Sequence, residues 1–257
     1  MFALASLSGA SDAAWARAGA SEADLAVLGG IALDADSRAA ACDLVARGRE
    51  EFLPADPFAF VDDQLAALAD APIRPGMNVR SATVEPIREA AAICTEHDAV
   101  LEINAHCRQD ELRAVGCGET LLRDTDRLAR YVAAADAAGA TVSVKVRAEV
   151  EGVDLPATAR RIAAAGADAI HVDAMDAEPV VASVAAAAPD CFLLANNGVR
   201  DRKTAWEYLA YGADGVSVGR PSDDPDVRRR VARAVKGWKR RRAADDPSPR
   251  LGAEVSG

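Results

Sequence analysis

The chain has 257 residues, which is enough for one domain with a large core, and half of its residues are apolar. No apolar stretch is long enough to span a bilayer, and no basic residue precedes the short apolar run at the start, so we expect a cytoplasmic protein without a membrane segment or secretory signal. The cysteines are odd in number and scattered without a CxxC pair, which excludes a disulfide scaffold and a structural zinc site.

Short β-type runs alternate with alanine-rich helical stretches along the chain, a pattern typical of strand–helix units around a parallel sheet. The predicted strands are Phe2–Ala5, Leu25–Leu28, Met77–Val79, Val100–Asn104, Thr141–Arg147, Ala169–Asp173, Phe192–Ala195 and Gly215–Val218. Helical patterns lie between them at Val84–Glu96, Thr125–Ala138, Leu155–Ala165, Pro179–Ala188 and Arg202–Tyr211. Residues 49–75 match the strand–helix alternation least well, and we predict that they form an extra loop and helix after the second strand–helix unit. The pattern predicts an α/β fold, a single-domain (β/α)8 TIM barrel over residues 1–242.

The formal charge of −10 is unevenly distributed along the sequence. Residues 227–242 contain nine basic residues and no acidic one, whereas the preceding part of the chain is strongly acidic. Apolar residues at helical spacing in this stretch, such as Val227 and Val231, predict the last barrel helix with one face on the barrel. Its arginines are then either a solvated face or a contact for RNA phosphates. Residues 243–257 have the composition of a disordered tail.

The carboxyl ends of the strands carry the polar residues that matter for function, because barrels of this kind build their sites there. Lysine is rare in this chain, and Lys145, on the fifth strand, is the only one before residue 203. A buried lysine in a barrel strand is costly unless it meets an anion. Glycines at the ends of the last two strands, followed by Arg220, are typical of a phosphate site. The sequence therefore predicts a phosphorylated, anionic cofactor across the barrel mouth.

A metal site is not expected. His171 and Asp173 lie on one side of the sixth predicted strand and could begin a metal site, but the sequence offers no third ligand near them.

A series of motifs follows the predicted strands in chain order. They are the Ser6–Asp12 turn, Asn104-Ala105-His106-Cys107-Arg108, the Gly116–Leu122 loop, Lys145-Val146-Arg147, and the two strand ends Asn197-Gly198 and Gly215–Arg220. In kind and order these motifs resemble those of the dihydrouridine synthase family, FMN-dependent barrels that reduce uridines in tRNA. The resemblance covers roughly residues 2–222.

The resemblance implies FMN as the cofactor, with NADPH as the electron donor. Lys145 would face the flavin ring and Asn78 would also contact it. The FMN phosphate would be held by Asn197, Gly198, Gly219 and Arg220.

For the substrate, the resemblance implies that Cys107 protonates C5 of a uracil ring while the flavin delivers hydride to C6. A thiol with an ordinary pKa is mostly protonated at neutral pH, which suits an acid. Asn104 and Arg147 would position the uracil. A cysteine can also be an inert packing residue, and that alternative stays open for Cys107.

The sequence departs from the family pattern at several positions. His106 and Arg108 stand where the family has Gly and Pro beside the cysteine, and Asp173 stands where it has His. We find no room after Arg242 for the helical domain with which family members hold tRNA. If tRNA is the partner, the basic helix 227–242 must bind it. The alternatives are an FMN oxidoreductase acting on a free pyrimidine or other small molecule, and a non-redox barrel that binds a phosphorylated metabolite.

Overall fold

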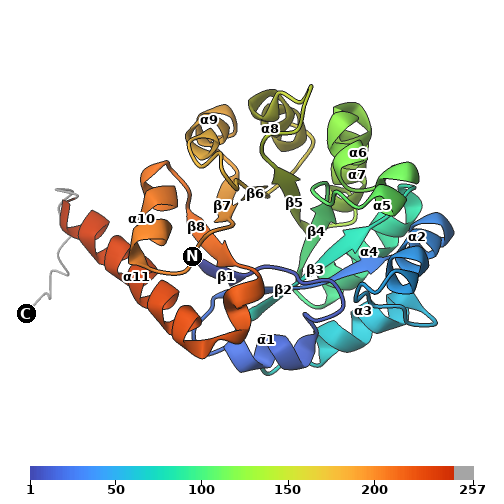
Figure 1. Cartoon of the computed structure of the whole chain (residues 1–257), viewed down its shortest axis with the longest axis horizontal. Coiled ribbons are helices and arrows are strands. Elements are labelled where there is room, and N and C mark those ends of the chain that lie inside the picture. Colours follow the sequence, from blue (N-terminus) through green and yellow to red (C-terminus); the bar gives the residue numbers. More distant parts are fainter. Residues whose placement is uncertain (246–257) are drawn as a thin grey trace, which may run out of the picture.

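The computed structural model describes residues 1–245 of the chain, and within them eight parallel strands close into a barrel (Figure 1). The strands follow one another around the barrel in chain order, and β1 closes it by pairing with β8. They are β1 (Phe2–Leu4), β2 (Leu25–Ala32), β3 (Arg74–Arg80), β4 (Val100–Asn104), β5 (Thr141–Arg147), β6 (Ala169–Asp173), β7 (Phe192–Asn196) and β8 (Gly215–Val218). The predicted TIM barrel is confirmed.

Helices surround the strands and bury the outer face of the barrel (Figure 1). They are α1 (Ala13–Gly19), α2 (Ala35–Ala46), α3 (Pro57–Ala66), α4 (Glu85–Glu96), α5 (Asp110–Ala114), α6 (Glu119–Arg123), α7 (Thr125–Asp136), α8 (Leu155–Ala163), α9 (Val180–Ala187), α10 (Arg202–Ala210) and α11 (Pro225–Asp245), with a 3₁₀ turn, η1, at Arg220–Asp223. None of the helices in residues 1–245 has the length and apolarity needed to cross a membrane.

The basic stretch forms most of α11, which ends at Asp245, three residues beyond the predicted barrel boundary at 242. Val227, Val231 and Val235 are buried, as the helical spacing predicted. Residues 243–245 are therefore helical, and the remainder of the expected tail, 246–257, lies outside the described residues.

The second strand is longer than the sequence pattern predicted, because the glycines that look like a turn continue it. A Cβ on Gly29 would lie 2.5 Å from the backbone oxygen of Asn78, and one on Gly30 would lie 2.5 Å from the Asn78 side chain. Only glycine allows β2 to pass this close to β3, and the strand register shifts between Gly29 and Ile31.

The segment 49–75 contains the extra loop and helix that the sequence predicted, in the form of α3 and the residues before it. Its loop lies against the top of the barrel, where Glu51 forms a buried ion pair of 2.7 Å with Arg80 at the end of β3. Arg80 also donates a hydrogen bond to Ser8 in the loop after β1. These contacts hold the loop across one side of the barrel mouth.

The inward-facing side chains change in character from the bottom of the barrel to its mouth. Apolar residues such as Val27, Val100 and Leu194 pack together near the amino ends of their strands. Two residues further along, on the same face, the strands carry buried polar groups, among them Glu102. Charged and amide side chains, such as Lys145, follow at the carboxyl ends. The mouth of the barrel is thus its polar end, where a site is expected.

Candidate functional site

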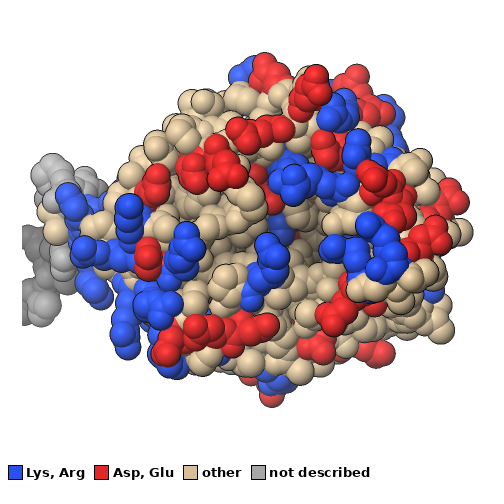
Figure 2. All heavy atoms as spheres, viewed as in Figure 1, with Lys and Arg blue, Asp and Glu red and all other residues tan. Residues whose placement is uncertain are grey.

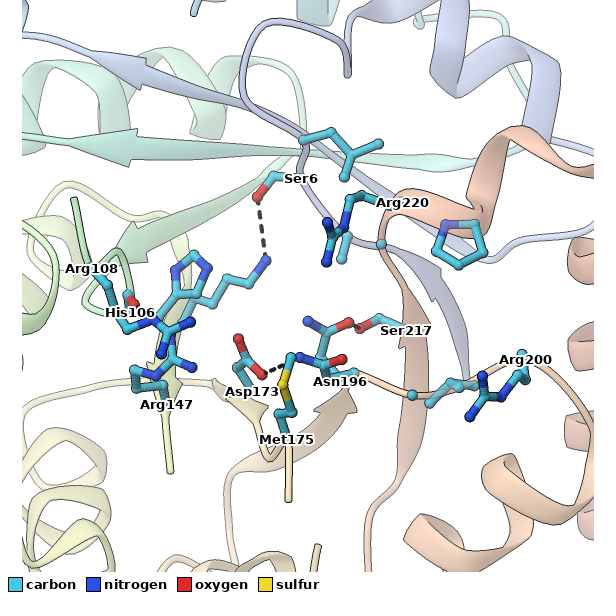
Figure 3. Close-up of a pocket in the computed structure, with 18 residues that line it drawn as sticks. Ser6, His106, Arg108, Arg147, Asp173, Met175, Asn196, Arg200, Ser217 and Arg220 are labelled. Carbon is cyan, nitrogen blue, oxygen red and sulfur yellow. Dashed lines mark hydrogen bonds between the residues drawn. The ribbon is translucent and has the colours of Figure 1, made fainter. Parts of the chain in front are cut away.

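A cavity of about 520 Å³ opens at the carboxyl ends of the strands. Figure 2 shows Lys and Arg side chains bordering the hollow at the centre of this face. Residues from six strand ends and the loops after them line the cavity (Figure 3): Ala5, Ser6, Leu7, His106, Arg108, Lys145, Arg147, Asp173, Met175, Asn196, Asn197, Gly198, Val199, Arg200, Ser217, Gly219, Arg220 and Pro221.

The lining is strongly cationic although the chain as a whole is acidic. It includes Lys145 and four arginines, and Asp173 is the acidic residue among them. The Asp173 carboxylate accepts a hydrogen bond of 2.9 Å from Asn197, so it lies beside the β7 end. Among residues 1–245, none of the five cations forms an ion pair. The cavity therefore fits an anionic ligand.

Lys145 is the most deeply placed of these cations. Only 2% of it is exposed, and its ammonium is 3.4 Å from the hydroxyl of Ser6 (Figure 3). The buried Glu102 carboxylate is near enough to interact electrostatically with this ammonium, but the two form no direct ion pair. A buried ammonium without a direct ion pair is costly, so an anion or an electron-rich group bound against it would stabilise the site. The prediction that Lys145 lies at the site is consistent with this position.

The ends of β7 and β8 form a glycine-lined cradle at one side of the cavity. Asn197 and Gly198 have φ angles of 85° and 68°, and a Cβ added to Gly198 would meet no atom within 4 Å. A Cβ on Gly219 would lie 4.0 Å from its nearest neighbour, Leu7. Open backbone of this kind, with Arg220 beside it, is typical of a phosphate-binding loop. The residues present therefore fit the phosphate of a flavin mononucleotide.

Two of the predicted site residues lie beneath the cavity rather than in its wall. Asn78 and Asn104 are 0% and 3% exposed, and the Asn104 amide donates a hydrogen bond of 2.9 Å to the Asn78 oxygen. The Asn78 amide in turn donates to Glu102 at 2.7 Å. The other side of Asn104 faces the following loop, where its oxygen accepts the backbone N–H groups of His106 and Cys107.

The same polar chain continues across the barrel from Glu102. His171 lies with Nδ1 2.6 Å from the Glu102 carboxylate and Nε2 2.8 Å from the Ser217 hydroxyl. The Ser217 hydroxyl donates to the oxygen of Asn196 at 2.9 Å, and both of these residues line the cavity. A continuous hydrogen-bonded chain thus links the loop after β4 with the ends of β7 and β8. His171 is therefore part of this chain.

The charge state of Glu102 follows from these contacts. Burial by itself would raise the pKa of this carboxyl, but His171, Lys145 and the Asn78 amide outweigh it and lower the pKa to about 2. At the cavity wall, burial and then the positive charges of Lys145, His171 and Arg147 hold the pKa of His106 well below its usual value. His106 is therefore neutral at neutral pH.

Cys107 lies beside the cavity, while its neighbours His106 and Arg108 line it. The Cys107 side chain is half-buried and packs with Cys117 against an apolar cluster from α2 and α5, formed by Ala40, Leu44 and Leu112. Its carbonyl accepts the N–H of Glu119 at 2.9 Å, which ties the cysteine loop to the glycine loop that follows. The role of Cys107 as an acid stays a prediction.

Some of the lining residues were not among those predicted from the sequence. Arg147, Asn197, Gly198, Gly219 and Arg220 line the cavity together with Lys145, as expected for neighbouring strand ends. Ser6, Arg108 and Arg200 were missed. Each lies in a loop that follows a strand end. The sequence signal that could have identified these residues was therefore their position shortly after a predicted strand.

Comparison with known proteins agrees with this geometry. The family model described as dihydrouridine synthase (Dus) matches residues 77–244. An uncharacterized protein of Methanocaldococcus jannaschii is 24% identical over 228 residues, covering 84% of this chain and 87% of that protein.

Among solved structures, DHODH from Eimeria tenella, crystallised in complex with ferulenol, shares the fold with a TM-score of 0.68. It is 15% identical, and the match covers 95% of this chain and 82% of that one. A FabK (M276A) mutant from Thermotoga maritima gives a TM-score of 0.56 at 17% identity, covering 86% of this chain and 61% of that one. The family match covers residues 77–244, which is more than half of the chain. The chain therefore belongs to the dihydrouridine synthase family and is a flavin-dependent oxidoreductase.

Proposed function

We propose that the protein binds FMN and reduces the C5=C6 bond of a uracil ring. The observation that carries this proposal is the buried Lys145, which forms no ion pair within residues 1–245 and lines a cavity whose other side is the glycine cradle beside Arg220. A ring that gains negative charge on reduction, joined to a phosphate, matches both features. Family membership favours this redox chemistry over the non-redox alternative.

The residues of this chain have distinct tasks in the proposed reaction. Lys145 stabilises negative charge on the flavin ring, and Asn197, Gly198, Gly219 and Arg220 hold the phosphate. Arg147 orients the substrate ring from the end of β5, and Asn104 does so by holding the loop of His106 and Cys107 in place. Cys107 donates the proton to C5. FMN held by these residues would supply the hydride for C6 after taking up electrons from NADPH, and the proton from Cys107 would complete the saturated ring.

Asn78 has a different part from the one expected from the resemblance. It lies beneath the cavity, hydrogen-bonded to Asn104 and Glu102. We propose that Asn78 acts through these two residues, by holding in place the polar layer on which the flavin would lie.

The proposed macromolecular partner is tRNA, bound by the basic helix 227–242. A groove of about 560 Å³ runs between α10 and α11 and is lined by Asp201, Arg202, Trp206, Arg230, Arg233, Ala234, Gly237 and Arg240. Asp201 and Arg202 of the groove follow Arg200 in the chain, and Arg200 lines the cavity. Arginines at this density support contact with phosphates of a nucleic acid.

The function is tested with purified, flavin-containing protein reduced by NADPH without oxygen. An unmodified tRNA transcript and uridine are then added separately. The expected result is reoxidation of the flavin, seen by absorbance, and a gain of two hydrogens in the uracil ring, seen by mass spectrometry. Activity on tRNA alone supports the RNA substrate, and activity on uridine supports the small-molecule alternative. A reduced flavin that no uracil compound reoxidises would exclude uracil reduction.

A further inference from the structure

Apart from Lys145, the cations in the cavity form two groups. The phosphate of the proposed cofactor accounts for one group and leaves the other without an anion. Arg220 and Arg200 belong to the loops after β8 and β7, beside the glycine cradle. Arg108 and Arg147 belong to the loop after β4 and the end of β5. Figure 3 shows the two groups on opposite sides of the cavity, with Asp173 and Asn196 between them.

The topology of the barrel explains this separation. In a closed barrel of eight strands in chain order, β4 lies opposite β8, because three strands lie between them in either direction. A phosphate seated at Gly219 and Arg220 is therefore across the mouth from Arg108. FMN carries one phosphate, so its binding leaves the Arg108 side without a phosphate partner.

Two guanidinium groups lie on the Arg108 side of the cavity (Figure 3). Arg147 is half-buried, and its Nη1 is 3.4 Å from the carbonyl of His106, a contact that places it beside the loop that carries Arg108. Neither arginine forms an ion pair among residues 1–245. Two cations brought together at a cavity wall repel each other, and an oxyanion between them removes that cost.

Asp173 is the register neighbour of Arg147 on β6, but its carboxylate accepts a hydrogen bond from Asn197 and, within residues 1–245, forms no ion pair with either arginine. His106 is neutral at neutral pH, so it adds neither a charge nor a competing anion. Glu102 is directed inward to Asn78 and His171. Arg108 also stands where the dihydrouridine synthase pattern has a proline, so this second cation is a feature of the present chain.

We propose that Arg108 and Arg147 bind an oxyanion of the substrate, a carboxylate or a phosphate attached to or next to the uracil ring. This inference rests on the proposed function for the identity of the ring. Guanidinium groups bind carboxylates and phosphates through two parallel hydrogen bonds, which fixes the ring relative to the flavin as well as binding it. The anion can come from a free pyrimidine carboxylate, a free nucleotide or the backbone phosphate of an RNA.

The test is a calorimetric titration of the flavin-loaded protein with four probes. Uracil is the neutral reference, and uracil-6-carboxylate, uridine 5′-monophosphate and a uridine trinucleotide supply the three sources of the anion. A charge-assisted contact is worth about tenfold to a hundredfold in affinity, so at least one anionic probe should bind more tightly than uracil by this factor. The probe that does so identifies the source.

The variants are Arg108→Ala, Arg147→Ala and Arg113→Ala. Arg113 is the matched control, because it is exposed, lies five residues from Arg108 and pairs with Asp110 at 3.2 Å. We expect Arg108→Ala and Arg147→Ala to lose the preference for the anionic probe and Arg113→Ala to keep it. Equal binding of uracil and all anionic probes by the wild type would overturn the proposal, as would a preference that survives in both cavity variants.

Flavin content, measured by absorbance after gel filtration, separates this inference from the proposed function. Arg108→Ala should retain its flavin, and loss of flavin would assign Arg108 to the cofactor and overturn the inference. Wild-type protein that binds no flavin would contradict the proposed function. In that case the same probes are titrated into the flavin-free protein, where loss of the preference for an anion in Arg108→Ala, but not in Arg113→Ala, still decides the role of Arg108.

Discussion

Lys145 is a residue whose burial makes sense only with a ligand. The residue is 2% exposed, and its ammonium has the Ser6 hydroxyl as its hydrogen-bonding partner and no direct ion pair among residues 1–245. Burying a charge without a partner costs free energy of folding, whereas a bound anionic group recovers that cost. Lys145 is therefore expected to destabilise the flavin-free protein and to stabilise the protein with bound FMN.

Replacing Lys145 with Met should have opposite effects on these two forms. If the penalty is about 1 kcal/mol, the Tm of the flavin-free protein should rise by roughly 2–4 °C in Lys145→Met. The increase in Tm on adding FMN should shrink, because the variant binds the cofactor more weakly. Thermal unfolding with and without FMN measures both effects. A lower Tm of the flavin-free variant would show that Lys145 is satisfied by the protein alone.

The two loop cysteines differ in environment, which makes one a control for the other. Cys117 is 1% exposed, and burial raises the pKa of its thiol to about 12, so it is protonated and inert. Cys107 is half-buried next to the cavity-lining residues His106 and Arg108. These positions favour Cys107 for chemistry and Cys117 for packing.

We expect Cys107→Ala to bind flavin and accept electrons but to reduce the uracil ring about a hundredfold to ten-thousandfold more slowly. Cys117→Ala should keep near-normal turnover, with a modest loss of stability from the cavity it leaves. Single-turnover reoxidation of the reduced flavin separates the chemical step from electron uptake. Wild-type rates in Cys107→Ala would exclude its thiol as the acid and leave it as a packing residue.

At the scale of elements, the strands bring their inward-facing residues into one polar layer below the cavity. Glu102 of β4 contacts Asn78 of β3 and His171 of β6, and that chain reaches Asn196 at the end of β7. Each contact joins residues from different strands, so the barrel must be closed and in register for the chain to form. The layer therefore couples the stability of the barrel to the geometry of the mouth.

The low pKa of Glu102 predicts how stability depends on pH. A carboxyl with a pKa of about 2 in the folded protein and about 4.3 when unfolded stabilises the fold above the higher value. That contribution is lost as the pH falls from about 4.3 to about 2. Glu102→Gln should therefore unfold with a weaker dependence on pH in this window than the wild type, in addition to being less stable at pH 7.

Urea unfolding at several pH values between neutral and acid measures this difference. Asp126→Asn is a suitable control, since this exposed carboxylate pairs with Arg161 at 3.2 Å and exposed pairs contribute little. An unchanged pH slope in Glu102→Gln would mean that other carboxyls dominate the acid transition.

Helix starts account for part of the acidic composition. Asp side chains accept backbone N–H groups at the amino ends of α1, α2, α3, α7, α8 and α10. Asp24, Asp168 and Asp214 lie just before strands and accept an N–H from the first residue, or the second, of a neighbouring strand. These acidic residues stabilise the ends of helices and strands. Their number therefore does not indicate which ligand binds at the cationic face.

At the scale of the whole molecule, charge is segregated between an acidic body and two basic regions. One region is the cavity mouth, and the other is the groove between α10 and α11 (Figure 2). In the groove, Arg202 lies over the Trp206 ring at 5.0 Å, and the Trp206 indole donates to the carbonyl of Ala234 at 2.9 Å. The groove wall is thus held by packing between the two helices.

Binding of tRNA in this groove predicts a change in salt dependence. Replacing Arg230, Arg233 and Arg240 together with Gln should weaken binding and flatten the plot of affinity against salt, by about one unit of slope for each lost phosphate contact. Filter binding at several salt concentrations measures both. The matched control replaces Arg88, Arg113 and Arg161, which are exposed, lie outside α10 and α11, and pair with Glu85, Asp110 and Asp126. The same affinity and slope in both triple variants would exclude the groove as the tRNA surface.

The sequence by itself determined the barrel and the neighbourhood of the site. Strand and helix patterns are local properties of the chain, so eight alternating units could be placed with errors of a few residues at their ends. The largest of these was in β2, where Gly29 and Gly30 continue the strand. Strand ends gather at one mouth in any parallel barrel, which is why Lys145, Arg147, Gly198, Gly219 and Arg220 were found together.

Only the tertiary structure decided which strand-end side chains face the cavity. Asn78 and Asn104 lie at or near the carboxyl ends of their strands, where site residues are expected. Their side chains instead bond to each other beneath the cavity. Cys107 packs against helices α2 and α5, while its two neighbours face the cavity. Arg108 and Arg147 come together because strand register and loop packing place them so. These arrangements depend on contacts between residues far apart in the chain, which a local sequence pattern does not contain.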